Sequence, residues 1–134
     1  MTIRILLVDD EPSLAGVMEL YLRKFIEDFE IIPVLNGRDA VVKVKELLEL
    51  ETPPDLTLMD LRMPAMDGIE CTKVLSEMGL RNIHILSAYV NAELLTEAQS
   101  VGAKGVLKKS EGFKANAIKV AEMVRVIRQP DPVT

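Results

Sequence analysis

The sequence contains only one cysteine, Cys71, and only one histidine, His84, among its 134 residues. A single cysteine excludes an internal disulfide and a cysteine-rich zinc site, and it fits a reducing compartment. No apolar run is long enough to cross a membrane, and the first residues lack the layout of a signal peptide. We therefore expect a cytoplasmic protein without a membrane partner.

The chain also lacks a basic excess. It has 16 Lys and Arg against 21 Asp and Glu, which gives a net charge of −5. Direct binding to nucleic acid requires clustered lysine and arginine to neutralise the phosphates, so this balance argues against it.

The length and the 49% of apolar residues predict one compact domain with a sizeable core. There is no internal repeat and no low-complexity segment. Only the last six residues have the composition of a linker, because they include Pro130 and Pro132. We expect one domain over residues 1–128 and a tail, or the start of a linker, over residues 129–134.

Short β-branched runs alternate with longer segments of helical period. Strands are predicted over Ile3–Val8, Phe29–Leu35, Leu56–Met59, Ile83–Leu86 and Gly105–Lys108. Helices are predicted over 13–26, 37–48, 68–78, 92–101 and 112–128. Five strand–helix units in a chain of this size indicate an α/β fold with a doubly wound, five-stranded parallel sheet. The expected strand order is 2-1-3-4-5, a flavodoxin-like arrangement of three layers.

Polar residues stand where four of these strands end. Asp9 and Asp10 follow the first strand, Asp60 follows the third, Ser87 ends the fourth and Lys109 follows the fifth. In such a sheet, ligands bind beyond the carboxyl ends of the strands, so these side chains should meet at one edge. Each alone could be a helix cap, a turn residue or a solvated charge. Together, three crowded carboxylates would repel one another unless a cation lies among them, and Mg²⁺ suits such oxygen ligands.

Four segments resemble the signatures of the receiver domains of two-component response regulators (CheY-like). They are ILLVDDE at 5–11, PDLTLMDLRMPAMDG at 54–68, ILSA at 85–88 and GAKGVLKK at 102–109. The resemblance extends from Ile3 to about Ile127. The segment around Asp60, with Met63-Pro64 and Asp67-Gly68 behind it, is the most specific of the four.

The resemblance implies a role for each of these residues. Asp60 matches the aspartate that accepts the phosphoryl group, and Lys109 matches the lysine that pairs with it. Ser87 matches the switch hydroxyl. Metal ligands would be Asp9, Asp10, Asp60 and the backbone carbonyl of Arg62, holding Mg²⁺ with Mn²⁺ as the alternative ion.

The resemblance also implies a phosphorylation-dependent switch, which is no enzyme beyond accepting and hydrolysing its own phosphoryl group. The donor would be a phosphohistidine of a sensor kinase or phosphotransfer protein. The phosphorylated receiver would then bind an output domain, a downstream protein or a second copy of itself. The binding surface would be formed by residues 92–101, 105–108 and 112–128. Two positions depart from the common pattern: Ser110 stands where many members carry proline, and Val106 where many carry tyrosine or phenylalanine.

Two other functions fit the sequence less well. A Mg²⁺-dependent hydrolase with an aspartyl nucleophile typically carries a second acid two residues later, where this chain has Arg62. A degenerate receiver that serves only as an interaction module does not require the complete set of site residues. His84 is interpreted as a plain strand residue, and Cys71 as a packing residue. Three apolar residues of the last helix, Ile118, Met123 and Val126, lie outside or at the edge of its inward stripe, which favours a binding surface there.

Overall fold

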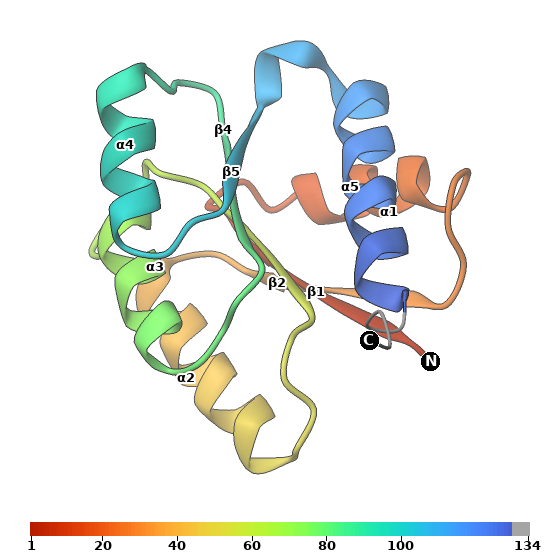
Figure 1. The fold of residues 1–134 in the computed structure, drawn as a ribbon, viewed down its shortest axis with the longest axis horizontal. Helices are drawn as coiled ribbons and strands as arrows, with labels where there is room; N and C mark the ends of the chain where they lie inside the picture. The colour runs from red at the N-terminus through yellow and green to blue at the C-terminus, as the bar shows by residue number, and fades with distance from the viewer. Residues whose placement is uncertain (130–134) are drawn as a thin grey trace, which may run out of the picture.

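The computed structural model describes residues 1–129 and forms a five-stranded parallel sheet with helices on both faces (Figure 1). The strands are β1 (Ile3–Val8), β2 (Phe29–Val34), β3 (Leu56–Met59), β4 (Ile83–Ser87) and β5 (Gly105–Lys108). Their order is β2-β1-β3-β4-β5, so the predicted fold class and strand order are confirmed.

The helices are divided between the two faces of the sheet. One face carries α1 (Leu14–Leu22) and α5 (Phe113–Arg128), and the other carries α2 (Gly37–Glu49), α3 (Gly68–Glu77) and α4 (Ala92–Ser100). This gives the three layers that the sequence predicts.

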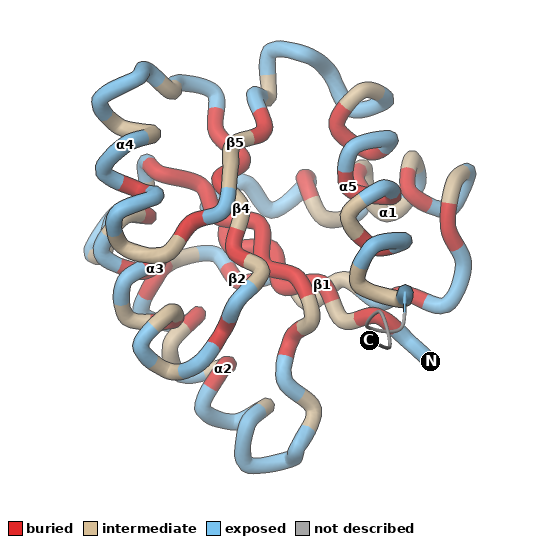
Figure 2. The backbone as a smooth tube through the Cα atoms, viewed as in Figure 1, coloured by how far each residue is buried: buried red, intermediate tan, exposed pale blue. Residues whose placement is uncertain are grey.

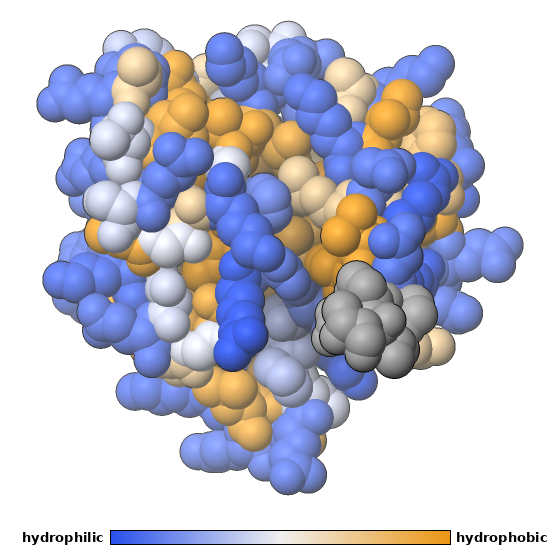
Figure 3. Space-filling model, viewed as in Figure 1, coloured by the Kyte–Doolittle hydropathy of each residue, from blue (hydrophilic) through white to orange (hydrophobic). Residues whose placement is uncertain are grey.

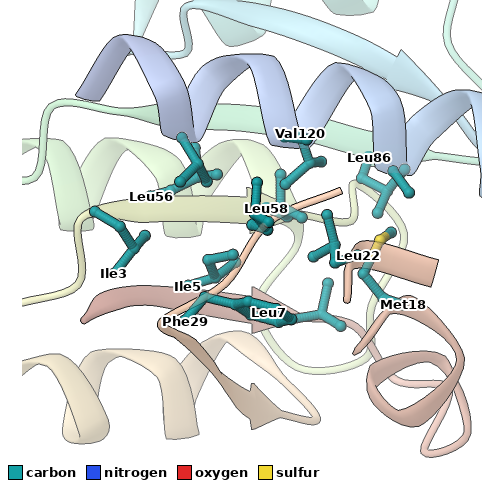
Figure 4. Close-up of a cluster of buried hydrophobic side chains, with 14 of the residues drawn as sticks. Ile3, Ile5, Leu7, Met18, Leu22, Phe29, Leu56, Leu58, Leu86 and Val120 are labelled. Atoms are coloured by element: carbon teal, nitrogen blue, oxygen red, sulfur yellow. The ribbon is translucent and has the colours of Figure 1, made fainter. Parts of the chain in front are cut away.

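The core therefore consists of two apolar layers, one on each face of the sheet. The strands between these layers are largely buried (Figure 2). Strand β1 contributes to both: Ile3, Ile5 and Leu7 pack under α1 and α5 (Figure 4), while Leu6 and Val8 pack under α2 and α3. A strand covered on both faces needs apolar residues at consecutive positions, which explains its nearly continuous apolar run.

Helix α1 ends four residues before the predicted boundary. The apolar spacing continues to Phe25 and Ile26, but the carbonyl of Leu22 accepts hydrogen bonds from the amides of both Phe25 and Ile26, and the chain leaves the helix in a turn. Ile26 is nevertheless buried. Asp28 then takes a left-handed backbone conformation with φ of 54° and leads into β2. The apolar residues of this turn stand at the same spacing as those of a helix. The predicted helix boundary at 26 was therefore wrong.

The remaining boundaries agree with the prediction or differ by one residue, and the one element that was not predicted follows β5. There, Lys109–Glu111 form a single 3-10 turn, η1, which was not predicted, and α5 begins at Phe113. Between residues 1 and 129 no helix is long and apolar enough to cross a membrane. The predicted tail lies, from Pro130 onward, outside the described residues.

Helices α2, α3 and α4 begin at the carboxyl edge of the sheet with a side-chain cap. The side-chain oxygens of Asn36, Asp67 and Asn91 each accept a hydrogen bond of 2.8 Å from a backbone amide three residues later. Such caps satisfy amides that have no partner within the helix. The caps thereby fix the ends of the three loops at this edge of the sheet. These loops surround the polar side chains described next.

Candidate functional site

The carboxyl edge of the sheet brings together the five polar side chains that the sequence placed there. Oxygens of Asp9, Asp10 and Asp60 all lie within 4.8 Å of one another. Ser87 and Lys109 both lie within reach of Asp60, from β4 and from the start of η1. Residues up to 100 positions apart in the chain therefore form one cluster, because β1, β3, β4 and β5 run parallel and end at the same edge.

Asp60 is buried, and its two carboxylate oxygens have different partners. Oδ1 accepts a hydrogen bond of 2.9 Å from the Ser87 hydroxyl, and Oδ2 lies 3.7 Å from the Lys109 ammonium. Burial raises the pKa of Asp60, and the neighbouring charge of Asp9 adds to this; Lys109, Ser87 and the backbone of Arg62 oppose the rise without cancelling it. The charged carboxylate is thus held in an environment that disfavours it.

Lys109 lies closer to Asp9 than to Asp60. Its ammonium is 2.6 Å from Asp9 Oδ2, while the other oxygen of Asp9 accepts from the amide of Glu11 at 2.9 Å. Burial acts to lower the pKa of Lys109, but its close pairing with Asp9 and the charge of Asp60 outweigh burial, and the pKa is raised. Lys109 is therefore a cation at neutral pH.

The cluster fits a divalent cation. Three carboxylates converge against a single ammonium, and the pKa of Asp60 is raised in spite of that ammonium. Asp10 is exposed, so its carboxylate can take a metal ion from solvent. Hard oxygen ligands of this number and charge suit Mg²⁺, which usually keeps several water ligands.

Gly68 keeps the loop after β3 close to Asp60. Its amide donates to the carbonyl of Leu61 at 2.9 Å, and a Cβ atom at this position would lie 2.0 Å from the carbonyl oxygen of Asp60. Only glycine permits this close approach of two backbone segments. Gly68 thus supports the site through its backbone, and Asp67 before it serves as the cap of α3.

Sequence reasoning missed a contact beside the cluster. The guanidinium of Arg62 lies 4.6 Å from the centre of the Tyr89 ring, in a cation–π geometry. These residues follow Asp60 and Ser87 by two positions each, so the pair links the ends of β3 and β4. No spacing in the sequence signals a contact between side chains 27 positions apart.

The residues that the sequence assigned to packing lie away from the cluster. Cys71 is buried on α3, and burial raises the pKa of its thiol to about 12. His84 is half-buried in β4, and burial, followed by the charge of Lys104, lowers its pKa.

The two positions that depart from the common family pattern are Ser110 and Val106. The peptide bond between Lys109 and Ser110 is trans, and residues 1–129 contain no cis peptide bond. Val106 is half-buried on β5.

Without a metal ion, Asp60→Asn is expected to raise the free energy of unfolding at pH 7. The folded state raises the pKa of Asp60, so the charged carboxylate destabilises the fold at any pH above that raised value. As the pH falls through it towards 3.8, the wild-type carboxylate binds a proton and the advantage of asparagine disappears. Urea unfolding in EDTA between pH 7 and pH 4 measures this. The exposed Glu97→Gln serves as control, and an Asp60→Asn advantage that is absent or independent of pH would contradict the account.

Comparisons with known proteins agree with one another. The family model described as the response regulator receiver domain matches residues 5–121. Transcriptional regulatory protein LnrK of Bacillus subtilis is 34% identical over 113 residues, which cover 80% of this chain and 47% of that protein. A protein-glutamate methylesterase/protein-glutamine glutaminase of Carboxydothermus hydrogenoformans is 36% identical over 129 residues, which cover 91% and 34%. The chain thus spans about a third to a half of these curated relatives.

Solved structures give the same result. The response regulator domain of Thermotoga maritima CheB matches with a TM-score of 0.77 and 27% identity, covering 98% of this chain and all of that one. CheY in the CheX–CheY–BeF3–Mg²⁺ complex from Borrelia burgdorferi matches with a TM-score of 0.77 and 26% identity, covering 96% and 90%.

Proposed function

The chain belongs to the receiver domain family of two-component response regulators, and on that premise we propose that Asp60 is its phosphoryl acceptor. The observation that carries this proposal is the convergence on Asp60: a hydroxyl on one oxygen, an ammonium near the other, and two further carboxylates within 4.8 Å. A receiver is a switch. The enzymatic activity in the name of a relative such as the methylesterase belongs to a protein of which this chain matches a third.

The proposed chemistry is a displacement at phosphorus. A carboxylate oxygen of Asp60 attacks the phosphorus atom, the bond between phosphorus and the imidazole nitrogen of the donor breaks, and an acyl phosphate forms. The departing imidazole takes up a proton. Because phosphoryl transfer depends mainly on positioning and on charge stabilisation, Lys109 contributes by offsetting the charge of the transferred oxygens. Ser87 is placed to exchange its hydrogen bond with Asp60 for one with the phosphoryl group.

Mg²⁺, or Mn²⁺ in its place, would be held by Asp10, Asp60 and the backbone carbonyl of Arg62, with Asp9 acting through water. When bound, the ion supplies positive charge that offsets repulsion between the carboxylates and the incoming phosphoryl group. The pairing of Asp9 with Lys109 at 2.6 Å supports an indirect role for Asp9.

The two other functions are not favoured. A hydrolase of the aspartyl-nucleophile type would carry an acid at position 62, and there the Arg62 side chain stacks on Tyr89. A receiver restricted to protein contacts has no need of the complete cluster around Asp60.

Incubation with radiolabelled acetyl phosphate and Mg²⁺ tests the proposal. We expect label that stays on the protein, depends on the metal ion and is released by hydroxylamine, as an acyl phosphate is. A hydrolase would release free phosphate without stable label, and a module that only binds partners would take none.

The partners of this chain are proposals of the same standing. We propose that a histidine kinase or a phosphotransfer protein is the donor, that the protein acts in the cytoplasm, and that residues 1–128 form the functional unit. One structure that this chain resembles is a complex of CheX and CheY with BeF3 and Mg²⁺.

The proposed output surface comprises α4, β5 and α5. Figure 3 shows apolar surface between α4 and α5, with strongly hydrophilic side chains in front of it. A groove of about 520 Å³ lies along β5 and α5, lined among others by His84, Lys104, Val106, Met123 and Val126. Residues 104–128 carry seven Lys and Arg against two Asp and Glu, although the whole chain is acidic. The groove itself is bordered by Lys104 and Lys119 against one acid, Glu122, which favours a partner with apolar and acidic side chains.

Phosphorylation is expected to change the association of this surface. Of the three residues that the sequence placed there, Val126 and Ile118 are 60% and 45% exposed, and Met123 is partly buried in the groove. We expect beryllofluoride, a phosphoryl mimic, to raise the mass of the wild type in analytical ultracentrifugation, and Met123→Glu and Val126→Glu to stay monomeric. Val42→Glu, an exposed valine on α2, is the control and should behave as wild type. A wild type of unchanged monomeric mass would exclude the second copy and leave a different protein as the partner.

A further inference from the structure

Asn116 is a buried polar residue on the core face of α5. Its neighbours on that face are Ala117, Val120, Ala121 and Val124, and Asn116 itself is only 3% exposed. Its side-chain amide donates a hydrogen bond of 3.0 Å to the carbonyl of Lys108, whereas its Oδ1 accepts no hydrogen bond from residues 1–129. A buried acceptor without a partner destabilises the fold, so an apolar residue would pack here at lower cost. The single bond to Lys108 is what asparagine adds.

That bond acts on the peptide group that carries Lys109. The carbonyl of Lys108 and the amide of Lys109 share one rigid plane, so fixing the oxygen fixes the direction in which the Lys109 side chain leaves the backbone. The Lys109 ammonium must then reach Asp9 at 2.6 Å and Asp60 at 3.7 Å. A small rotation of this plane would be magnified along the four carbons of the side chain.

Helix α5 contacts the η1 turn through two side chains: Asn116 at the carbonyl of Lys108, and Lys119, which pairs with Glu111 at 3.0 Å. The three residues of η1 are not buried, and a cavity of about 200 Å³ adjoins Lys109, Phe113 and Asn116. Leu14, Met18 and Leu86 line the far side of the cavity. Side-chain packing therefore leaves room for Lys109 to shift, and the hydrogen bond from Asn116 restrains the peptide beside Lys109 in addition to the pairing of Lys108 with Ser87 in the sheet.

We propose that Asn116 is a positioning residue for phosphoryl transfer, which acts by orienting Lys109; the proposal rests on the proposed role of Asp60. Its effect is confined to Lys109, because Asn116 has no contact with the carboxylates that would bind the metal. The rate of phosphorylation should depend on Asn116, and the affinity for Mg²⁺ should not.

Asn116→Leu tests the proposal, since leucine has a similar size and no donor. We expect labelling by acetyl phosphate to slow by about 10-fold or more, in the range known for residues that orient a functional group, while the Kd for Mg²⁺ changes less than about twofold. Val124→Ala, on the same buried face but far from Lys109, is the control for general destabilisation and should leave both unchanged. In a Lys109→Met background, Asn116→Leu should have no further effect on the rate, because its target is gone.

A second measurement does not require phosphorylation. Crystal structures of the variants show the position of the Lys109 ammonium, which should lie farther than 2.6 Å from Asp9 Oδ2 in Asn116→Leu but not in Val124→Ala. The proposal is overturned if Asn116→Leu labels at the wild-type rate, if it weakens Mg²⁺ binding in equal measure, or if the Lys109–Asp9 contact is unchanged. A wild type that takes no label would refute the acceptor role of Asp60 instead, and the position of Lys109 would still decide on Asn116.

Discussion

Asp60→Asn is expected to reduce labelling by acetyl phosphate by at least about 10³-fold, the size of effect seen when a nucleophile is removed. The amide of asparagine has almost the same shape as the carboxylate, so Ser87 and the backbone of β3 keep their places. It has no anionic oxygen, however, and cannot form the acyl phosphate. The fold should be retained, and without a metal ion it should be more stable than the wild type at neutral pH, because the disfavoured charge is absent.

The matched control for this substitution is Asp67→Asn. Asp67 lies seven residues further on and caps α3 through its side-chain oxygen, a role that asparagine fills equally well. Asp67→Asn should therefore accept label at the wild-type rate. Hydroxylamine-sensitive label that persists on Asp60→Asn near the normal rate would transfer the acceptor role to Asp9 or Asp10.

Gly68→Ala is expected to lower the free energy of unfolding by about 3 kcal/mol or more, at the upper end of the cost of overpacking. The added methyl group would lie 2.0 Å from the carbonyl oxygen of Asp60 and 2.7 Å from the Cα of Leu61. Both are backbone atoms of a segment that is buried between β1 and α3, so neither can move away without displacing the end of β3. Phosphorylation should fall together with stability, since the displaced residue is Asp60.

Gly16→Ala provides the comparison. Gly16 lies within α1, and a Cβ there would meet no other described atom within 4 Å. Alanine should stabilise this helix, by up to about 1 kcal/mol. Urea unfolding of both variants measures the difference, and a Gly68→Ala variant within about 0.5 kcal/mol of the wild type would show that the loop after β3 relaxes freely.

The sequence predicted the fold and the members of the site for a simple physical reason. In a parallel sheet, strands covered on both faces are short apolar runs, and the residue after each run lies at the carboxyl edge. Asp9, Asp60 and Lys109 were therefore found by position alone. The end of α1 was not, because Phe25 and Ile26 keep helical spacing while they are buried in a turn.

Contacts between side chains on different elements also could not be predicted from the sequence. That Lys109 pairs more closely with Asp9 than with Asp60 depends on the path of η1, which no periodicity indicates. Nothing in the sequence singled out Asn116, which is buried because it lies on the face of α5 that packs on the sheet. The Arg62–Tyr89 pair likewise depends on two loops whose shapes are set by the strands they follow.

The uneven distribution of charge along the chain has a consequence for kinetics. Residues 1–103 carry nine Lys and Arg against eighteen Asp and Glu, whereas the segment that forms β5 and α5 is positive. Positive charge is thus concentrated on two elements, β5 and α5, and it attracts an approaching acidic surface before the two surfaces touch. Because the field extends over roughly 8 Å at physiological ionic strength, this steering acts on the rate of encounter. Added salt should slow the association of an acidic partner much more than it accelerates dissociation.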